Sequence, residues 1–78
     1  MIGYLSVGSQ EQREALVAHL RNSILCLDLD VTMLAVKTPL LVEWEAETSN
    51  DLKIVSALAL AFNVGWRLAQ DYAKGKTK

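Results

Sequence analysis

The chain has 78 residues, of which 51% are hydrophobic, and its eight Lys and Arg against nine Asp and Glu give a formal net charge of −1. This length holds a single domain, residues 1–78, and the balanced charge excludes a bulk attraction to nucleic acid or to an anionic membrane. One cysteine, Cys26, excludes an internal disulfide and most cysteine metal sites. It lies in an apolar run and is expected to behave as a small hydrophobe. The first residues lack the basic start and apolar core of a signal peptide, so a cytoplasmic protein is expected.

The N-terminal part predicts one helix after a short apolar segment. Residues 2–7 form a short segment with Gly3 near its start and Gly8 directly after it, which favours an edge strand or a loop. Ser9 begins a capping box with Gln12 at the third position after it, which predicts a helix from Gln10 to about Asn22. Asn22-Ser23 is the expected exit of that helix.

The middle of the chain admits two interpretations. A 3-4 spacing of apolar residues favours one long helix and an all-α bundle; the residues that carry it are Val17, Leu20, Ile24, Leu27, Val31 and Leu34. Against this, two polar trios alternate strictly with apolar residues: Asp28, Asp30 and Thr32, and then Glu43, Glu45 and Glu47. On a strand each trio shares one face, whereas on a helix each trio would be split between opposite sides. We therefore expect a β-hairpin, with the all-α helical bundle as the alternative.

The same alternation predicts the register of this hairpin. Pairing Val36 with Leu41 leaves residues 37–40, which include the turn residues Thr38-Pro39, as the loop. Apolar residues then face each other on one side, and mostly acidic residues face each other on the other side. The expected pairs are Met33–Trp44 and Val31–Ala46 on the apolar side, and Asp30–Glu47 and Thr32–Glu45 on the acidic side.

Residues 50–74 predict a long C-terminal helix. Thr48 begins a second capping box with Asp51, and Gly75 suits the left-handed residue that ends a helix, with 75–78 as a frayed tail. A helix of that length spans about 37 Å, whereas a compact domain of this size has a radius of gyration of about 11–12 Å. It should therefore overhang its own domain and expose apolar surface unless another chain covers it.

Two rows of side chains run along this helix. Large apolar residues recur at three and four positions, and small residues recur at every fourth position, from Ala57 to Ala73. Gly65 costs about 1 kcal/mol relative to Ala inside a helix. Close packing of a second helix would offset that cost, while the high helix propensity of alanine is the plainer explanation of the small row. The predicted oligomer interface consists of Ala57, Leu58, Ala61, Phe62, Gly65, Trp66 and Ala69.

The elements together predict a small two-layer α+β domain in the order helix–strand–strand–helix, with a possible short N-terminal strand and a long C-terminal helix. Two groups of polar residues are candidate contacts for a partner or a ligand. The first is the acidic hairpin face, which suits docking of a basic partner, a divalent cation or simply solvation: Asp28, Asp30, Glu43, Glu45 and Glu47. The second is the polar side of the last helix, where a surface Arg67–Asp71 ion pair is the plain alternative: Asn63, Arg67 and Gln70.

No motif of a known chemistry is present: the sequence has no phosphate-binding glycine loop, G-x-S-x-G, H-E-x-x-H or C-x-x-C. His19 is the only histidine, so no catalytic residue, metal or cofactor is predicted. Residues 54–69 contain Asn63 and Arg67 and are expected to be too short and too polar to span a membrane.

We therefore predict a non-enzymatic interaction module that forms a homodimer or larger homo-oligomer and binds a partner protein, as a regulator, inhibitor or assembly subunit. One alternative is an oligomeric binder of a small molecule, such as a nucleotide, with an intersubunit pocket lined by Trp44, Trp66, Tyr72 and Arg67. Another is an enzyme at an oligomer interface that uses His19 or the acidic residues.

Overall fold

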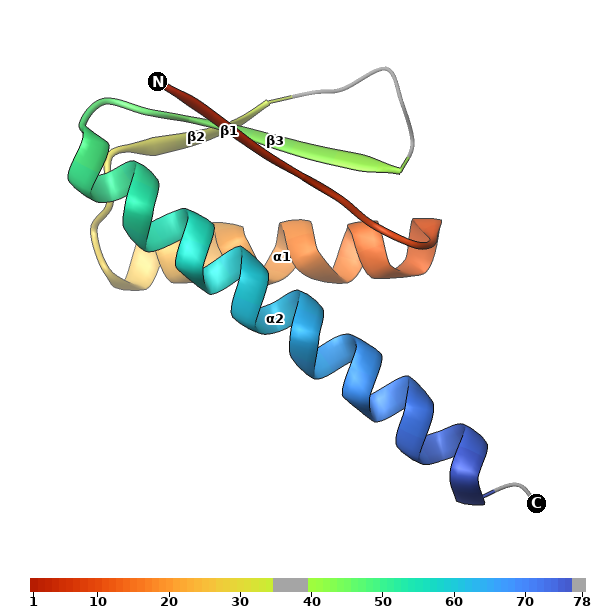
Figure 1. The fold of residues 1–78 in the computed structure, drawn as a ribbon. Coiled ribbons are helices and arrows are strands. Elements are labelled where there is room, and N and C mark those ends of the chain that lie inside the picture. Colours follow the sequence, from red (N-terminus) through yellow and green to blue (C-terminus); the bar gives the residue numbers. More distant parts are fainter. Residues whose placement is uncertain (35–39, 77–78) are drawn as a thin grey trace.

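The computed structural model describes residues 1–34 and 40–76. It contains three strands and two helices in the order β1 (Ile2–Ser6), α1 (Gln10–Cys26), β2 (Val31–Leu34), β3 (Leu41–Ala46) and α2 (Ser49–Lys76) (Figure 1). The predicted α+β fold, its helix–strand–strand–helix order and the N-terminal strand are confirmed, and the all-α alternative is wrong. The alternation of polar and apolar residues outweighed the helical spacing because one face of the hairpin is buried.

The sheet is antiparallel, with strand order β1-β3-β2, so the last strand in sequence is the central one. The predicted hairpin register is confirmed: Met33 lies opposite Trp44 and Val31 opposite Ala46. The expected Val36–Leu41 pair and the Thr38-Pro39 turn involve residues outside the described ranges.

Both helices cover the same face of the sheet, and the other face is open (Figure 1). Helix α1 packs against β2 and β3, whereas α2 packs against β1, β3 and α1. The core between the layers centres on Trp44 of the central strand, which is 1% exposed. Gly3 of β1 lies opposite Trp44, and a Cβ built at Gly3 would overlap the indole ring. Glycine is therefore required there by close packing rather than by an unusual backbone angle.

Helix α1 begins as predicted and ends later than predicted. The Gln12 N–H donates to the Ser9 hydroxyl at 3.1 Å, as in a capping box. The expected exit at Asn22-Ser23 is wrong: the helix continues to Cys26, and Asp28 then reverses the chain with a left-handed φ of 53°. Ile24 packs against the core, and this contact keeps the last turn of α1 helical. Cys26 is consequently exposed, contrary to expectation.

Helix α2 begins at a confirmed cap, where the Asp51 N–H donates to the Thr48 hydroxyl at 3.2 Å. The Asp51 carboxylate also accepts from the Asp30 N–H at 3.1 Å, which ties the start of α2 to the segment before β2. The expected helix end at Gly75 is wrong, because Gly75 is helical and has no positive φ. The 28 residues of α2 span about 42 Å, and Figure 1 shows the C-terminal half projecting beyond α1 and the sheet.

Candidate interaction surfaces

The side of α2 that faces away from the core carries a row of large apolar residues. Val55 and Ala59 are fully buried on the inner side. On the outer side, Leu60, Val64, Leu68 and Tyr72 are 55%, 56%, 64% and 66% exposed. Their spacing of four places them in one nearly straight row.

A row of small residues runs beside the large ones. Ala57, Ala61, Gly65 and Ala69 are all exposed, and a Cβ built at Gly65 meets no atom within 4 Å. No contact in the described part of the chain therefore requires glycine at position 65. We call the two rows together the outer face of α2.

The residues of the predicted oligomer interface lie on two different sides of α2. Leu58, Phe62 and Trp66 are partly buried and turn toward their own domain. Phe62 stacks on His19 at 5.0 Å and on Trp66 at 6.1 Å between ring centroids. The small residues of the prediction lie on the outer face instead. The exposed residues Leu60, Val64 and Leu68 were not part of the prediction, although their spacing of four was readable in the sequence.

The total exposed area of the chain is larger than that of a typical compact monomer of the same mass. A compact monomer of 8.6 kDa exposes about 4,700 Å², whereas this chain exposes 5407 Å². The excess of about 700 Å² is close to the roughly 800 Å² that each partner buries in a standard protein interface. Its radius of gyration of 13.4 Å likewise exceeds the value of about 11.5 Å for a compact chain of this length.

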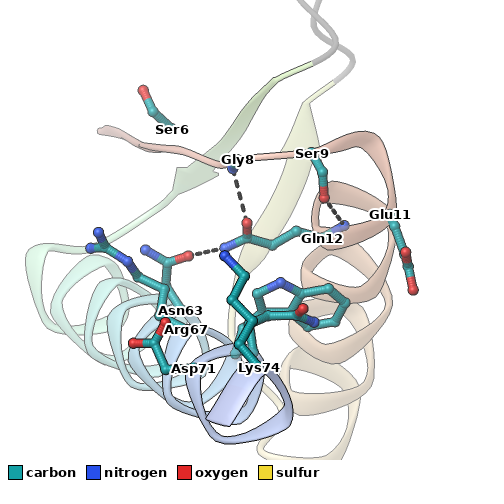
Figure 2. Close-up of a pocket in the computed structure, with 11 residues that line it drawn as sticks. Ser6, Gly8, Ser9, Glu11, Gln12, Asn63, Arg67, Asp71 and Lys74 are labelled. Carbon is teal, nitrogen blue, oxygen red and sulfur yellow. Dashed lines mark hydrogen bonds between the residues drawn. The ribbon is translucent and has the colours of Figure 1, made fainter. Parts of the chain in front are cut away.

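A cleft of about 550 Å³ lies between the loop after β1, the start of α1 and the polar side of α2 (Figure 2). Gln12 closes its inner end and is only 5% exposed. Its Oε1 accepts from the Gly8 N–H at 2.9 Å, and its Nε2 donates to the Asn63 Oδ1. Asn63, predicted as a partner or ligand contact, is thus held in a bond within the chain.

The remaining lining of the cleft has mixed charge. Arg67 and Gln70, two further predicted contact residues, lie on its wall with Asp71, Lys74 and Glu11. Two cationic and two anionic side chains give it no net preference for an anion or a cation. Residues 1–34 and 40–76 also contain no group of His, Cys, Asp and Glu placed to hold a metal ion.

Of the five predicted acidic residues, all except Asp28 lie in or directly beside β2 and β3. Glu43 and Glu45 alternate with buried residues of β3 and therefore lie on the open face of the sheet. Asp30 and Glu47 flank the strands, where the Glu47 N–H donates to the Asp30 carbonyl at 3.1 Å. The placement of Asp28 on this face is wrong, because β2 begins at Val31 and Asp28 lies in the turn after α1.

Two further predictions concern aromatic and catalytic residues. Trp44 cannot line an intersubunit pocket with Trp66 and Tyr72, because it is buried in the core of its own domain. His19 is exposed and stacks on Phe62, and Cys26 lies two helical turns away from it. The structure therefore does not bring Cys26 to His19.

Helix length and composition carry a second implication. An 18-residue window within Ser49–Gly75 has a mean hydropathy of 1.3, and only 11% of that window is buried within the chain, so α2 is long and apolar enough to cross a membrane by length and composition. The core helix of a soluble protein passes the same test.

No family model matches the sequence, and no curated protein or solved structure shows significant similarity to it. The fold thus defines a small two-layer α+β domain with an uncovered apolar helix face.

Proposed function

We propose that this protein is a non-enzymatic interaction module that self-associates through the outer face of α2. One observation carries the proposal: Leu60, Val64, Leu68 and Tyr72 form a row along the helix, and each is more than half exposed. A row of this kind exposes apolar surface to water at a cost of about 25 cal/mol per Å². Covering it is therefore favourable, and a second copy of the chain supplies a matching surface in equal concentration.

The outer face suits a second copy in shape as well as in polarity. Large residues of one helix can seat against the small row of the other, which permits close approach of the two backbones at Ala61 and Gly65. A two-fold symmetric dimer buries the same face on both copies. At about 100° per residue, Arg67 and Asp71 fall along one flank of this face, where they would form a solvated rim, and Lys53 continues the small row one turn before Ala57.

The open face of the sheet supports the second half of the proposal, the binding of a partner protein. Tyr4 is 69% exposed there and lies beside Glu43 across the β1–β3 pair. Exposed tyrosine is a residue type enriched in protein interfaces, and the carboxylates beside it suit a partner that carries basic residues. Both faces would be available at once, because one lies on the sheet and the other on the helix layer.

The test is the mass of the purified protein in solution, measured by light scattering across a range of concentrations. We expect a dimer or larger oligomer for the natural sequence and a monomer for the Val64→Glu, Leu68→Glu double variant. Both positions are exposed within the chain, so its circular dichroism should be unchanged. The matched control is Gln70→Glu, which places a carboxylate at an exposed position on the polar side of the same helix, away from the outer face.

Two results would overturn the proposal. The first is a natural sequence that stays monomeric at about 0.1 mM, well above the micromolar dissociation constants of many weak but specific pairs. The second is recovery of the natural sequence only in the membrane fraction, with the double variant released to the soluble fraction, since lipid would then be the cover of α2.

A further inference from the structure

β1 is an edge strand with one unpaired side. In the ladder with β3, the Ala46 N–H donates to the Met1 carbonyl at 2.8 Å and the Val7 N–H donates to the Leu40 carbonyl at 3.0 Å. Hydrogen-bonded residues alternate along an antiparallel strand, so Gly3 and Leu5 also turn their backbone groups toward β3. The backbone N–H and C=O groups of the three alternate residues point outward in the plane of the sheet, away from β3: Ile2, Tyr4 and Ser6.

This edge carries none of the features that normally prevent strands from pairing. Residues 2–7 contain no charged residue and no proline. The side chains of Ile2 and Tyr4 are 58% and 69% exposed, so no other described element covers them. The opposite edge, β2, is shorter and is preceded by Asp28 and Asp30. β1 is therefore the edge at which a further strand can add.

The helix layer points to a second copy as the source of that strand. Helix α2 packs beneath β1, whereas α1 packs beneath β2. A strand added at β1 therefore arrives on the side of the molecule that α2 occupies. If that strand is β1 of a second copy, its own α2 comes with it on the same side of the joined sheet, and the excess exposed area described above is enough for one such interface.

We propose that two copies pair β1 with β1 in antiparallel fashion, which joins their three-stranded sheets into one continuous sheet with the two α2 helices beneath the junction. This inference rests on the proposed self-association and gives its geometry. Pairing centred on Tyr4 places Tyr4 opposite Tyr4 of the second copy and Ile2 opposite Ser6. In that register every outward N–H and C=O of the three residues is bonded, whereas a shift by two residues leaves some of them unpaired.

Disulfide trapping tests the register directly. In a Cys26→Ser background, Tyr4→Cys places two thiols on directly opposed residues, whose Cα atoms are about 5.5 Å apart in a hydrogen-bonded pair. That separation lies within the range of disulfides, about 4.4–6.8 Å. The matched control is Ser6→Cys, since two copies of residue 6 would be offset by four residues, or about 14 Å along the strands.

Under mild oxidation we expect the Tyr4→Cys variant to convert mostly to a covalent dimer and the Ser6→Cys variant to remain largely uncrosslinked. Equal crosslinking of the two variants, or failure of the Tyr4→Cys variant to crosslink, would overturn the pairing. Both variants should have the circular dichroism of the Cys26→Ser background, so that the comparison reports on pairing of folded chains.

A second comparison separates this inference from the proposed function. Tyr4→Pro removes an N–H that points away from β3, so the domain should stay folded while the edge loses its central donor; Tyr4→Val keeps that N–H. We expect Tyr4→Pro to weaken the dimer at least tenfold and Tyr4→Val to leave it nearly unchanged. A Tyr4→Pro variant that dimerises normally, beside a monomeric Val64→Glu, Leu68→Glu variant, refutes strand pairing and leaves the helix interface standing. The opposite pattern refutes the helix interface.

Discussion

Substitution of glycine by alanine should have opposite effects at two positions of this chain. At Gly3 the new methyl group would overlap the indole of Trp44, which is 1% exposed and enclosed by both layers. Overpacking of a filled core costs about 1–3 kcal/mol, more than the roughly 0.5–1 kcal/mol that alanine regains over glycine in a strand. At Gly65 a methyl group meets nothing within 4 Å, so Gly65→Ala should stabilise the isolated chain by up to about 1 kcal/mol through helix propensity.

Thermal and urea unfolding followed by circular dichroism at low protein concentration would measure both changes. In a domain of this size a change of 1 kcal/mol shifts the melting temperature by about 4–8 °C. Gly3→Ala should therefore melt at least several degrees lower and Gly65→Ala a few degrees higher than the natural sequence. At high concentration the gain at Gly65 should shrink, because the added methyl group would separate two paired helices. Unchanged stability of Gly3→Ala would show that the indole moves freely and that the packing argument is wrong.

Three further predictions concern hydrogen bonds within the chain. Gln12→Leu should destabilise the fold by about 1–3 kcal/mol for each group that it leaves unpaired, and a double-mutant cycle with Asn63→Ala should show coupling, because the two amides bond directly. Ser9→Ala and Thr48→Ala should each cost about 1 kcal/mol and add independently in chemical denaturation, since each removes the cap of a different helix. Asp51→Ala should cost about 0.5–1.5 kcal/mol in the same assay, because it loses the bond to the Asp30 N–H. The control Lys53→Ala, at an exposed position, should stay within about 0.5 kcal/mol of the natural sequence. Equal losses in the two variants would contradict a stabilising role of the Asp51–Asp30 hydrogen bond.

Local rules predicted the elements and the register because the signals lie in neighbouring residues. The alternation around Trp44 and Met33 determines which side of each strand is buried, and a shift by one residue would turn every carboxylate inward. The starts of both helices were predictable because Ser9 and Thr48 bond within their own first turns. The end of α1 was not, because packing of Ile24 and the left-handed backbone of Asp28 decide it.

The candidate surfaces were only partly predictable for a related reason. Helix α2 is apolar on almost every side between residues 54 and 62, so periodicity alone does not say which row meets the core. Position in the fold decides that Ala59 is buried while Leu60 is exposed. The bond between Gln12 and Asn63 joins residues 51 positions apart, and no local pattern marks either residue as the partner of the other.

The place of β3 in the sheet also governs the order in which the chain can fold. β3 is the third strand in sequence but the central one in space, and each of the other strands pairs only with it. When only the first forty residues have been synthesised, β1 and β2 are present, but β3, the strand with which both of them pair in the described sheet, is not. None of the residue pairs of β1 and β2 with β3 can form until residues 41–46 have left the ribosome, whereas α1 contains all of its own backbone bonds and does not have to wait for β3. The nascent chain thus exposes the uncharged, unpaired β1 segment throughout that interval. This is the stage at which the chain is most prone to aggregation and at which binding of a molecular chaperone would help most.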